Sequence, residues 1–97
     1  MPPRPTEDRP SRIAKESMRF AQEARDLGLH LRALREDLGL TLEQLAERAA
    51  VAPKHAQKIE AGRINVTLVT LVRLADGLGT SVRNLFPLPS PPTKPKA

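Results

Sequence analysis

The side chains best suited to bind another molecule are concentrated in one short polar segment. Lys54, Gln57 and Lys58 lie close together, and on a helix this spacing leaves Ala56 and Ile59 as the inward-facing residues. Two ammonium groups and one amide are hydrogen-bond donors, and the ammonium groups also attract anions. The segment therefore presents a polar face on a helix that has few apolar anchors.

Groups that perform catalysis elsewhere are present but are not organised for it. The chain has no cysteine, which excludes disulfides, thiolate metal sites and a thiol nucleophile. His30 and His55 are not spaced to share a metal ion. No nucleophile motif or phosphate-binding loop accompanies the serines and acids. We expect a protein that is not an enzyme and that uses no cofactor and no metal.

The formal net charge of +5 suits a polyanionic partner, but the charge is unevenly distributed. Residues 24–86 carry nine basic and seven acidic groups, whereas the tail from Pro87 carries two basic groups and no acidic one. No apolar run approaches the roughly 20 residues that span a bilayer, and the start lacks the apolar stretch of a signal peptide. We expect a cytoplasmic protein with no membrane partner.

The ten prolines mark the two ends of the chain. All except Pro53 lie within residues 1–10 and 87–97. Proline lacks an amide donor and disfavours a helical conformation for the residue before it. We therefore predict a disordered Pro/Arg-rich N-terminus at 1–10 and a Pro-rich, basic, disordered tail at 87–97. The tail either packs on nothing or carries a motif for a proline-binding domain.

Between these ends the apolar residues have helical spacing. Leucines recur from Leu27 to Leu38 in alternating steps of four and three, which predicts the first core helix. The same rhythm continues backwards to Ile13, so residues 11–23 form an amphipathic helical extension with Ser11 as a candidate N-cap. This extension is part of the first core helix, a separate short helix, or a frayed segment that orders against a partner.

Caps and glycines mark the boundaries of the next two helices. Gly39 suits the end of the first helix, and Thr41 with Gln44 matches a capping box at the start of the second. Pro53 then favours the first turn of a third, short helix that ends at Gly62.

Two further helical segments complete the pattern. Thr67 caps a fourth helix with an apolar stripe from Leu68 to Leu78, and Ser81 caps a final short turn that Pro87 stops. No segment shows the sustained alternation of a strand. The sequence predicts an all-α fold, a compact bundle of about five short helices with one core domain at 24–86.

The segment TLEQLAERAAVAPKHAQKIEAG, from Thr41 to Gly62, resembles the helix-turn-helix of the phage-repressor-like proteins, often called the XRE family. The resemblance implies a lambda-repressor-like domain that binds specific sequences of double-stranded DNA as a transcriptional regulator, a repressor, associated with the nucleoid when bound. It extends from Leu27 to Phe86 and rests on four pieces in order: Leu38-Gly39-Leu40-Thr41, Leu45-Ala46, Ile59-Glu60-Ala61-Gly62, and Leu71-x-x-Leu74-Ala75-x-x-Leu78-Gly79 followed by Leu85-Phe86.

In this family the start of the second paired helix faces base edges in the major groove. The resemblance places Pro53, Lys54, Gln57 and Lys58 there, on a helix from Pro53 to Ala61. Lysine can donate to O6 and N7 of guanine, and Gln57 can bond to N6 and N7 of adenine. The two lysines are alternatively phosphate contacts or idle surface charges. Pro53 either touches a thymine methyl group or only starts the helix.

The resemblance also implies contacts to the DNA backbone, which fix register without reading sequence. We assign these to Thr41, His55, Arg63 and Asn65. His55 alternatively packs against the edge of the helix. Asn65 also suits a turn, because its side chain can bond to the local backbone.

One structural pair and three departures from the family pattern complete the prediction. The resemblance implies an ion pair between Arg35 and Glu60 that orients the reading helix. Ala50 stands where glycine is common and Ala52 where a capping hydroxyl is common, so we expect a strained turn and an uncapped third helix. Leu42 replaces a residue that often contacts phosphate, which weakens the expected affinity.

Repressors of this type usually bind as pairs, so we expect a homodimer. One candidate interface comprises Leu78, Val82, Leu85 and Phe86, and the other is the stripe from Ile13 to Phe20; either set is alternatively monomer core. The rival function is a protein-interaction module, antitoxin-like or an adaptor, whose termini hold a protein partner.

Overall fold

The computed structural model describes residues 8–88, and within that range it contains helices and no strand. The all-α fold class predicted from the sequence is confirmed. The disorder predicted for residues 1–7 and 89–97 concerns segments outside the described range. The elements are α1 (Asp8–Asp37), α2 (Leu42–Ala49), α3 (Pro53–Glu60), α4 (Leu68–Leu78) and the 3₁₀ turn η1 (Val82–Leu85).

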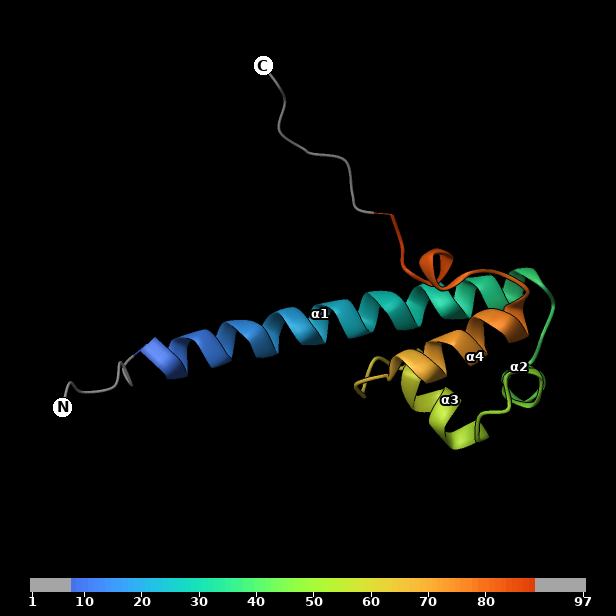
Figure 1. Cartoon of the computed structure of the whole chain (residues 1–97), viewed down its shortest axis with the longest axis horizontal. Helices are drawn as coiled ribbons and strands as arrows, with labels where there is room; N and C mark the ends of the chain where they lie inside the picture. The colour runs from blue at the N-terminus through green and yellow to red at the C-terminus, as the bar shows by residue number, and fades with distance from the viewer. Residues whose placement is uncertain (1–7, 89–97) are drawn as a thin grey trace, which may run out of the picture.

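Helix α1 is a single element of 30 residues, which decides among the three alternatives for the extension and makes α1 longer than the short helices of the predicted bundle. Residues 11–23 continue the first core helix without a break. The helix begins at Asp8 and not at Ser11, so residues 8–10 are helical where we predicted disorder. Pro10 is compatible with this because a first helical turn has no intrahelical partner for the amide that proline lacks. In Figure 1 the N-terminal half of α1 extends beyond the rest of the molecule.

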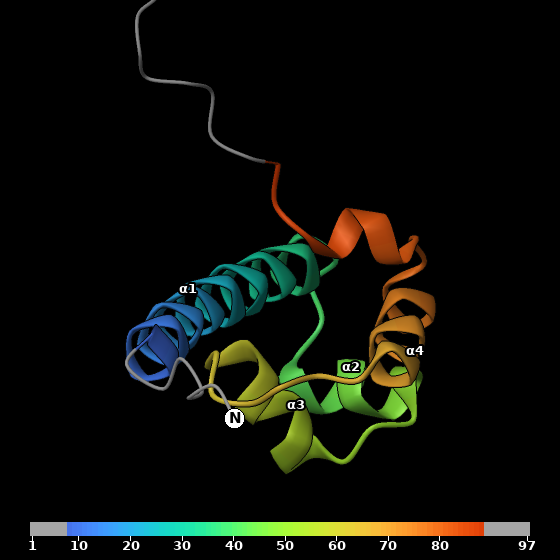
Figure 2. The same ribbon diagram turned by 60° about the vertical axis from the view of Figure 1, so that its left-hand side comes forward.

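The other elements gather around the C-terminal half of α1. Helix α2 packs against α3 and α4, α3 packs against α1, and η1 contacts both α4 and α1. Figure 2 shows η1 between α1 and α4. Five large side chains are almost completely buried, one from each element, so a single core joins all five elements: Leu31, Leu45, Ile59, Leu74 and Leu85.

Local hydrogen bonds set the starts of α2 and α4 as predicted. The capping box of α2 is confirmed: the Gln44 amide donates to Thr41 Oγ1 at 3.0 Å, and the Thr41 amide donates to Gln44 Oε1 at 2.8 Å. The Thr67 hydroxyl accepts from the Thr70 amide at 3.2 Å and caps α4. Ser81 occupies the N-cap position of η1 but makes no side-chain capping bond, which corrects the role we predicted for it.

The hydrophobic pattern overestimates the core at two leucines. Leu38 is exposed because α1 has already ended at Asp37, and Leu68 is exposed because no described element covers the first turn of α4. In the first candidate interface, by contrast, two residues are more buried than a dimer surface requires. Leu78 and Leu85 are buried in the monomer core, which leaves Phe86 as the exposed member of that set.

Candidate nucleic-acid interface

Helix α3 has one buried side and one exposed side. Ala56 and Ile59 are buried and fix the helix to the core. The side chains that the sequence assigned to base contacts are all exposed: Pro53, Lys54, Gln57 and Lys58. The structure therefore brings the four predicted reading residues onto one accessible surface.

The exposed side of α3 surrounds a shallow hollow of about 340 Å³. Its lining residues are Lys54, Gln57, Lys58, Ala61 and Arg63. Three of these are cations and none is acidic, so the hollow favours anionic or hydrogen-bond-accepting partners. Arg63, predicted as a phosphate contact, joins three of the predicted base contacts at this hollow.

An ion pair holds the end of α3 against α1. Arg35 Nε donates to Glu60 Oε2 at 2.8 Å and Arg35 Nη2 donates to Glu60 Oε1 at 3.0 Å, a two-point contact. The two side chains are only 13% and 9% exposed. Arg35 Nη1 also donates to the carbonyl of Leu40 at 2.8 Å, which ties in the turn before α2.

The hydrogen bond to Glu60 raises the pKa of the Arg35 guanidinium, against the lowering effect of its burial. A group with a raised pKa contributes stability that is present below its ordinary pKa and is lost only as pH rises through the raised one. Because arginine is charged far above neutral pH in any case, Arg35 holds its charge throughout the physiological range. The guanidinium therefore holds the end of α3 at any such pH.

Two glycines, which the sequence analysis did not assign to the site, allow the same two helices to approach closely. A Cβ placed on Gly28 of α1 would lie 2.7 Å from the Ile59 carbonyl oxygen. A Cβ on Gly62, directly after α3, would lie 2.7 Å from the Cα of Arg25, and Gly62 also has φ +72°. Glycine inside a helix costs stability, so its presence at position 28 indicates that another group approaches the helix there. This was the one signal of the contact that the sequence offered.

The start of α3 is held more weakly than its end. Ala50, before the helix, has φ 57° and ψ 43°, a left-handed conformation that is costly for a residue with a Cβ. Ala52 at the N-cap makes no side-chain hydrogen bond, so the first amides of α3 lack a capping partner. The departures noted in the sequence thus correspond to a strained turn and an uncapped helix.

The residues assigned to phosphate contacts lie on both sides of α3. Thr41 is exposed, and its hydroxyl oxygen accepts the capping bond from Gln44. Because that oxygen is used as an acceptor, the hydroxyl proton can still be donated to a phosphate. His55 is half-buried on α3, whereas Asn65 is exposed in the loop after it.

Arg32 is a further cation at this surface that the sequence analysis missed. It lines a second hollow of about 220 Å³ together with Gln57 and Glu60. Its Nε donates to Glu36 at 3.0 Å, in an ion pair whose side chains are 60% and 54% exposed. Its spacing of three residues from Arg35 was the available signal, because such residues are neighbours on a helix.

The sequence matches the family described as the helix-turn-helix domain over residues 26–86. The chain belongs to this family. This helix-turn-helix protein is 36% identical, over 55 residues, to the uncharacterized HTH-type transcriptional regulator y4dJ of Sinorhizobium fredii. That alignment covers 57% of this chain and 71% of y4dJ.

Solved structures agree with the family assignment. The restriction-modification controller protein C.AhdI from Aeromonas hydrophila is 34% identical, with a TM-score of 0.66, over 67% of this chain and 98% of that one. The clp gene regulator ClgR from C. glutamicum is 37% identical, with a TM-score of 0.60, over 64% of this chain and 80% of that one. The two names describe a controller protein and a gene regulator.

The resemblance to XRE-type proteins is therefore confirmed, and the chain is a DNA-binding transcriptional regulator with a helix-turn-helix domain. Its paired helices are α2 and α3. None of the helices within residues 8–88 combines the length and hydrophobicity that a membrane span requires.

Proposed function

We propose that this regulator is a repressor that binds operator DNA as a homodimer, with α3 in the major groove. The observation that supports this best is the cationic hollow on the exposed side of α3, formed by Lys54, Gln57, Lys58, Ala61 and Arg63. A groove about 12 Å wide admits one helix, and the buried side of α3 is held by the core and by the Arg35–Glu60 pair. Its place of action would be the nucleoid in the cytoplasm.

In this proposal the contacts divide into base reading and positioning. Pro53, Lys54, Gln57 and Lys58 face base edges, the lysines donating to guanine and Gln57 bonding to adenine. Positioning contacts to phosphate come from Thr41, His55, Arg63 and Asn65, with the addition of Arg32 from α1.

Selection of bound duplexes from a random library tests the proposal. The wild type should enrich a palindromic motif with half-sites one helical turn, about 34–36 Å, apart. A Lys54→Ala, Lys58→Ala double variant should lose the motif and bind the selected duplex about 30-fold more weakly, which corresponds to about 2 kcal/mol. The matched control removes two exposed cations elsewhere, Arg73→Ala with Arg83→Ala. It should retain the motif.

Salt titration separates base reading from phosphate binding by the lysines. Each phosphate contact contributes about 0.9 to the slope of log affinity against log salt, so loss of two contacts lowers the slope by about 2. Loss of the motif with an unchanged slope would assign the lysines to bases. No enrichment by the wild type, or a double variant that behaves like the control, would overturn the proposal.

Repression itself is tested by placing the selected motif over a promoter that drives a reporter gene. Expression of the wild type should lower reporter output, whereas the Lys54→Ala, Lys58→Ala variant should not. Higher output with the wild type would instead identify an activator.

A protein-interaction module is the second candidate function. Ile13, Met18 and Phe20 on the N-terminal half of α1 are exposed, which is the observation that favours it. Strongly salt-dependent duplex binding by the isolated chain would favour the DNA-binding proposal over this one.

A further inference from the structure

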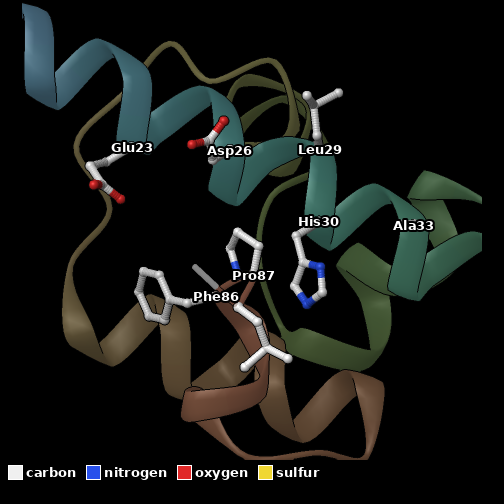
Figure 3. Close-up of a pocket in the computed structure, with 8 residues that line it drawn as sticks. Glu23, Asp26, Leu29, His30, Ala33, Phe86 and Pro87 are labelled. Atoms are coloured by element: carbon white, nitrogen blue, oxygen red, sulfur yellow. The ribbon is translucent and has the colours of Figure 1, made fainter. Parts of the chain in front are cut away.

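A groove of about 600 Å³ lies between α1 and the chain that follows η1. Figure 3 shows Phe86 and Pro87 on one side of it and the α1 side chains on the other. Leu29 and Leu88, which also line it, are 64% and 90% exposed. Burying such residues is favourable at about 25 cal/mol per Å² of apolar surface, so this groove is suited to a partner surface.

The acidic groups of the groove form no ion pair within the part of the chain whose side chains are described. Within residues 12–88 the ion pairs are Arg32–Glu36 and Arg35–Glu60, so neither Glu23 nor Asp26 is paired there. Asp26 accepts a hydrogen bond from the neutral amide of Gln22 at 3.0 Å. The groove therefore offers two carboxylates beside an apolar surface.

The complementary surface lies on the same helix. Arg12, Lys15 and Arg19 are exposed and spaced by three and four residues, which places them on one side of α1. Asp26 lies seven residues after Arg19, close to two full turns, so the same side becomes acidic further along. Within residues 12–19 this side of α1 therefore carries three cations and Glu16, a net positive charge, whereas at the groove it is acidic.

We propose that a second copy of this chain binds the groove, with the N-terminal halves of the two α1 helices antiparallel. A two-fold axis that passes between the two α1 helices, level with position 21, sets Arg19 opposite Glu23 of the second copy and Lys15 opposite Asp26 of the second copy. The same two contacts recur in reverse, as a two-fold interface requires. Met18 and the aliphatic stems of the basic residues then cover the apolar part of the groove.

This inference rests on the homodimer of the proposed function and names its surface, and its geometry suits a DNA reader. Asp26 and Arg35 are nine residues apart, about two and a half turns, so the groove is on the side of α1 opposite α3. Arg32 lies about a third of a turn around α1 from the groove. Because the two-fold axis is perpendicular to the paired helices, the side of the dimer on which Arg32 lies in one copy is also its side in the second copy. The cationic surfaces of the two copies thus face the same way.

The spacing of the two reading helices follows from ordinary helix packing. Three helix contacts of about 9 Å each, α3 to α1, α1 to α1 and α1 to α3, separate the two α3 helices by about 27 Å. Gly28, where α3 touches α1, lies about 10 Å along the helix from the axis, so the two contacts are offset by about 20 Å. The combined separation is about 34 Å, one turn of B-DNA.

Two charge-reversed forms of the full-length chain test the surface by sedimentation equilibrium. Lys15→Glu with Arg19→Glu makes both contact positions in the N-terminal half of α1 acidic, and Glu23→Lys with Asp26→Lys makes both contact positions at the groove basic. Each variant alone should dimerise about 100-fold more weakly than the wild type, because four contacts become repulsive. An equimolar mixture should form a heterodimer within about tenfold of wild-type affinity. Circular dichroism should show both variants folded.

The matched control reverses a pair on another helix, Arg73→Glu with Asp76→Lys, both exposed on α4, and should dimerise like the wild type. Unchanged dimerisation of the two α1 variants, or a mixture that stays monomeric, would overturn this inference. A palindromic DNA motif obtained alongside that result would leave the proposed function standing. If the mixed variants form the heterodimer but the wild type enriches no duplex motif, this inference stands and the proposed function fails.

Discussion

Replacing Gly28 with alanine tests how closely α1 and the end of α3 are packed. A Cβ at this position would lie 2.7 Å from the Ile59 carbonyl oxygen and nearer still to that of Glu60. Both atoms are backbone, so no side-chain rotation relieves the contact and the end of α3 must move. Overpacking of this kind costs about 1–3 kcal/mol, and an unyielding backbone contact belongs at the upper end.

Helix propensity acts in the opposite direction. Alanine is favoured over glycine inside a helix by about 1 kcal/mol. Subtracting this from a clash of about 3 kcal/mol leaves a net loss of about 2 kcal/mol in the free energy of unfolding. For a domain of this size, such a loss lowers the melting temperature by about 10 °C.

Urea unfolding followed by circular dichroism measures the change directly. Gly77→Ala is the matched control because Gly77 also lies inside a helix, and its added Cβ would be 3.1 Å from the Ala49 amide nitrogen, a milder contact. Propensity should offset that contact and leave stability nearly unchanged. If Gly28→Ala were as stable as the wild type, the close approach would not be what requires glycine in α1.

The remaining predictions use the same unfolding measurement. Glu60→Ala should cost about 3 kcal/mol because it leaves a largely buried guanidinium unpaired, whereas Glu36→Ala, in an exposed pair, should cost less than about 0.5 kcal/mol. Equal losses would contradict the role given to burial. Ala50→Gly should add about 1 kcal/mol by relieving the left-handed conformation of an exposed residue, and a less stable variant would refute the strain. Ala52→Ser should add about 1 kcal/mol by capping α3; no gain would show that the free amides are satisfied by other means.

Features set by neighbouring residues were predictable from the sequence. Thr41 and Gln44 are three positions apart, and their capping box needs nothing beyond the helix that they start. The apolar face of α3 and its exposed polar side likewise follow from spacing within eight residues. The family resemblance supplied the pairing partner of Arg35, which periodicity does not give.

Features that depend on contacts between distant segments were missed. The spacing of Leu38 and Leu68 is helical, but periodicity does not show whether another element covers the stripe at its ends. Gly28 is explained only by its contact with α3, 31 residues further along at Ile59. Arg32 lines the same hollow as Gln57 because folding brings the two residues together. The continuity of α1 was also open, since one helix and two share the same periodicity.

The two ends of α3 are held unequally, and this affects how the helix can move. Near Glu60 it is fixed by the two-point contact with Arg35 and by the backbone of α1 at Gly28. Near Pro53 it has a strained turn and no cap. Thermal motion should therefore pivot α3 about its last turn, with an amplitude that grows toward its first. In the proposed complex, natural binding sites should vary most at the base pair that Lys54 meets and least at the one that Lys58 meets.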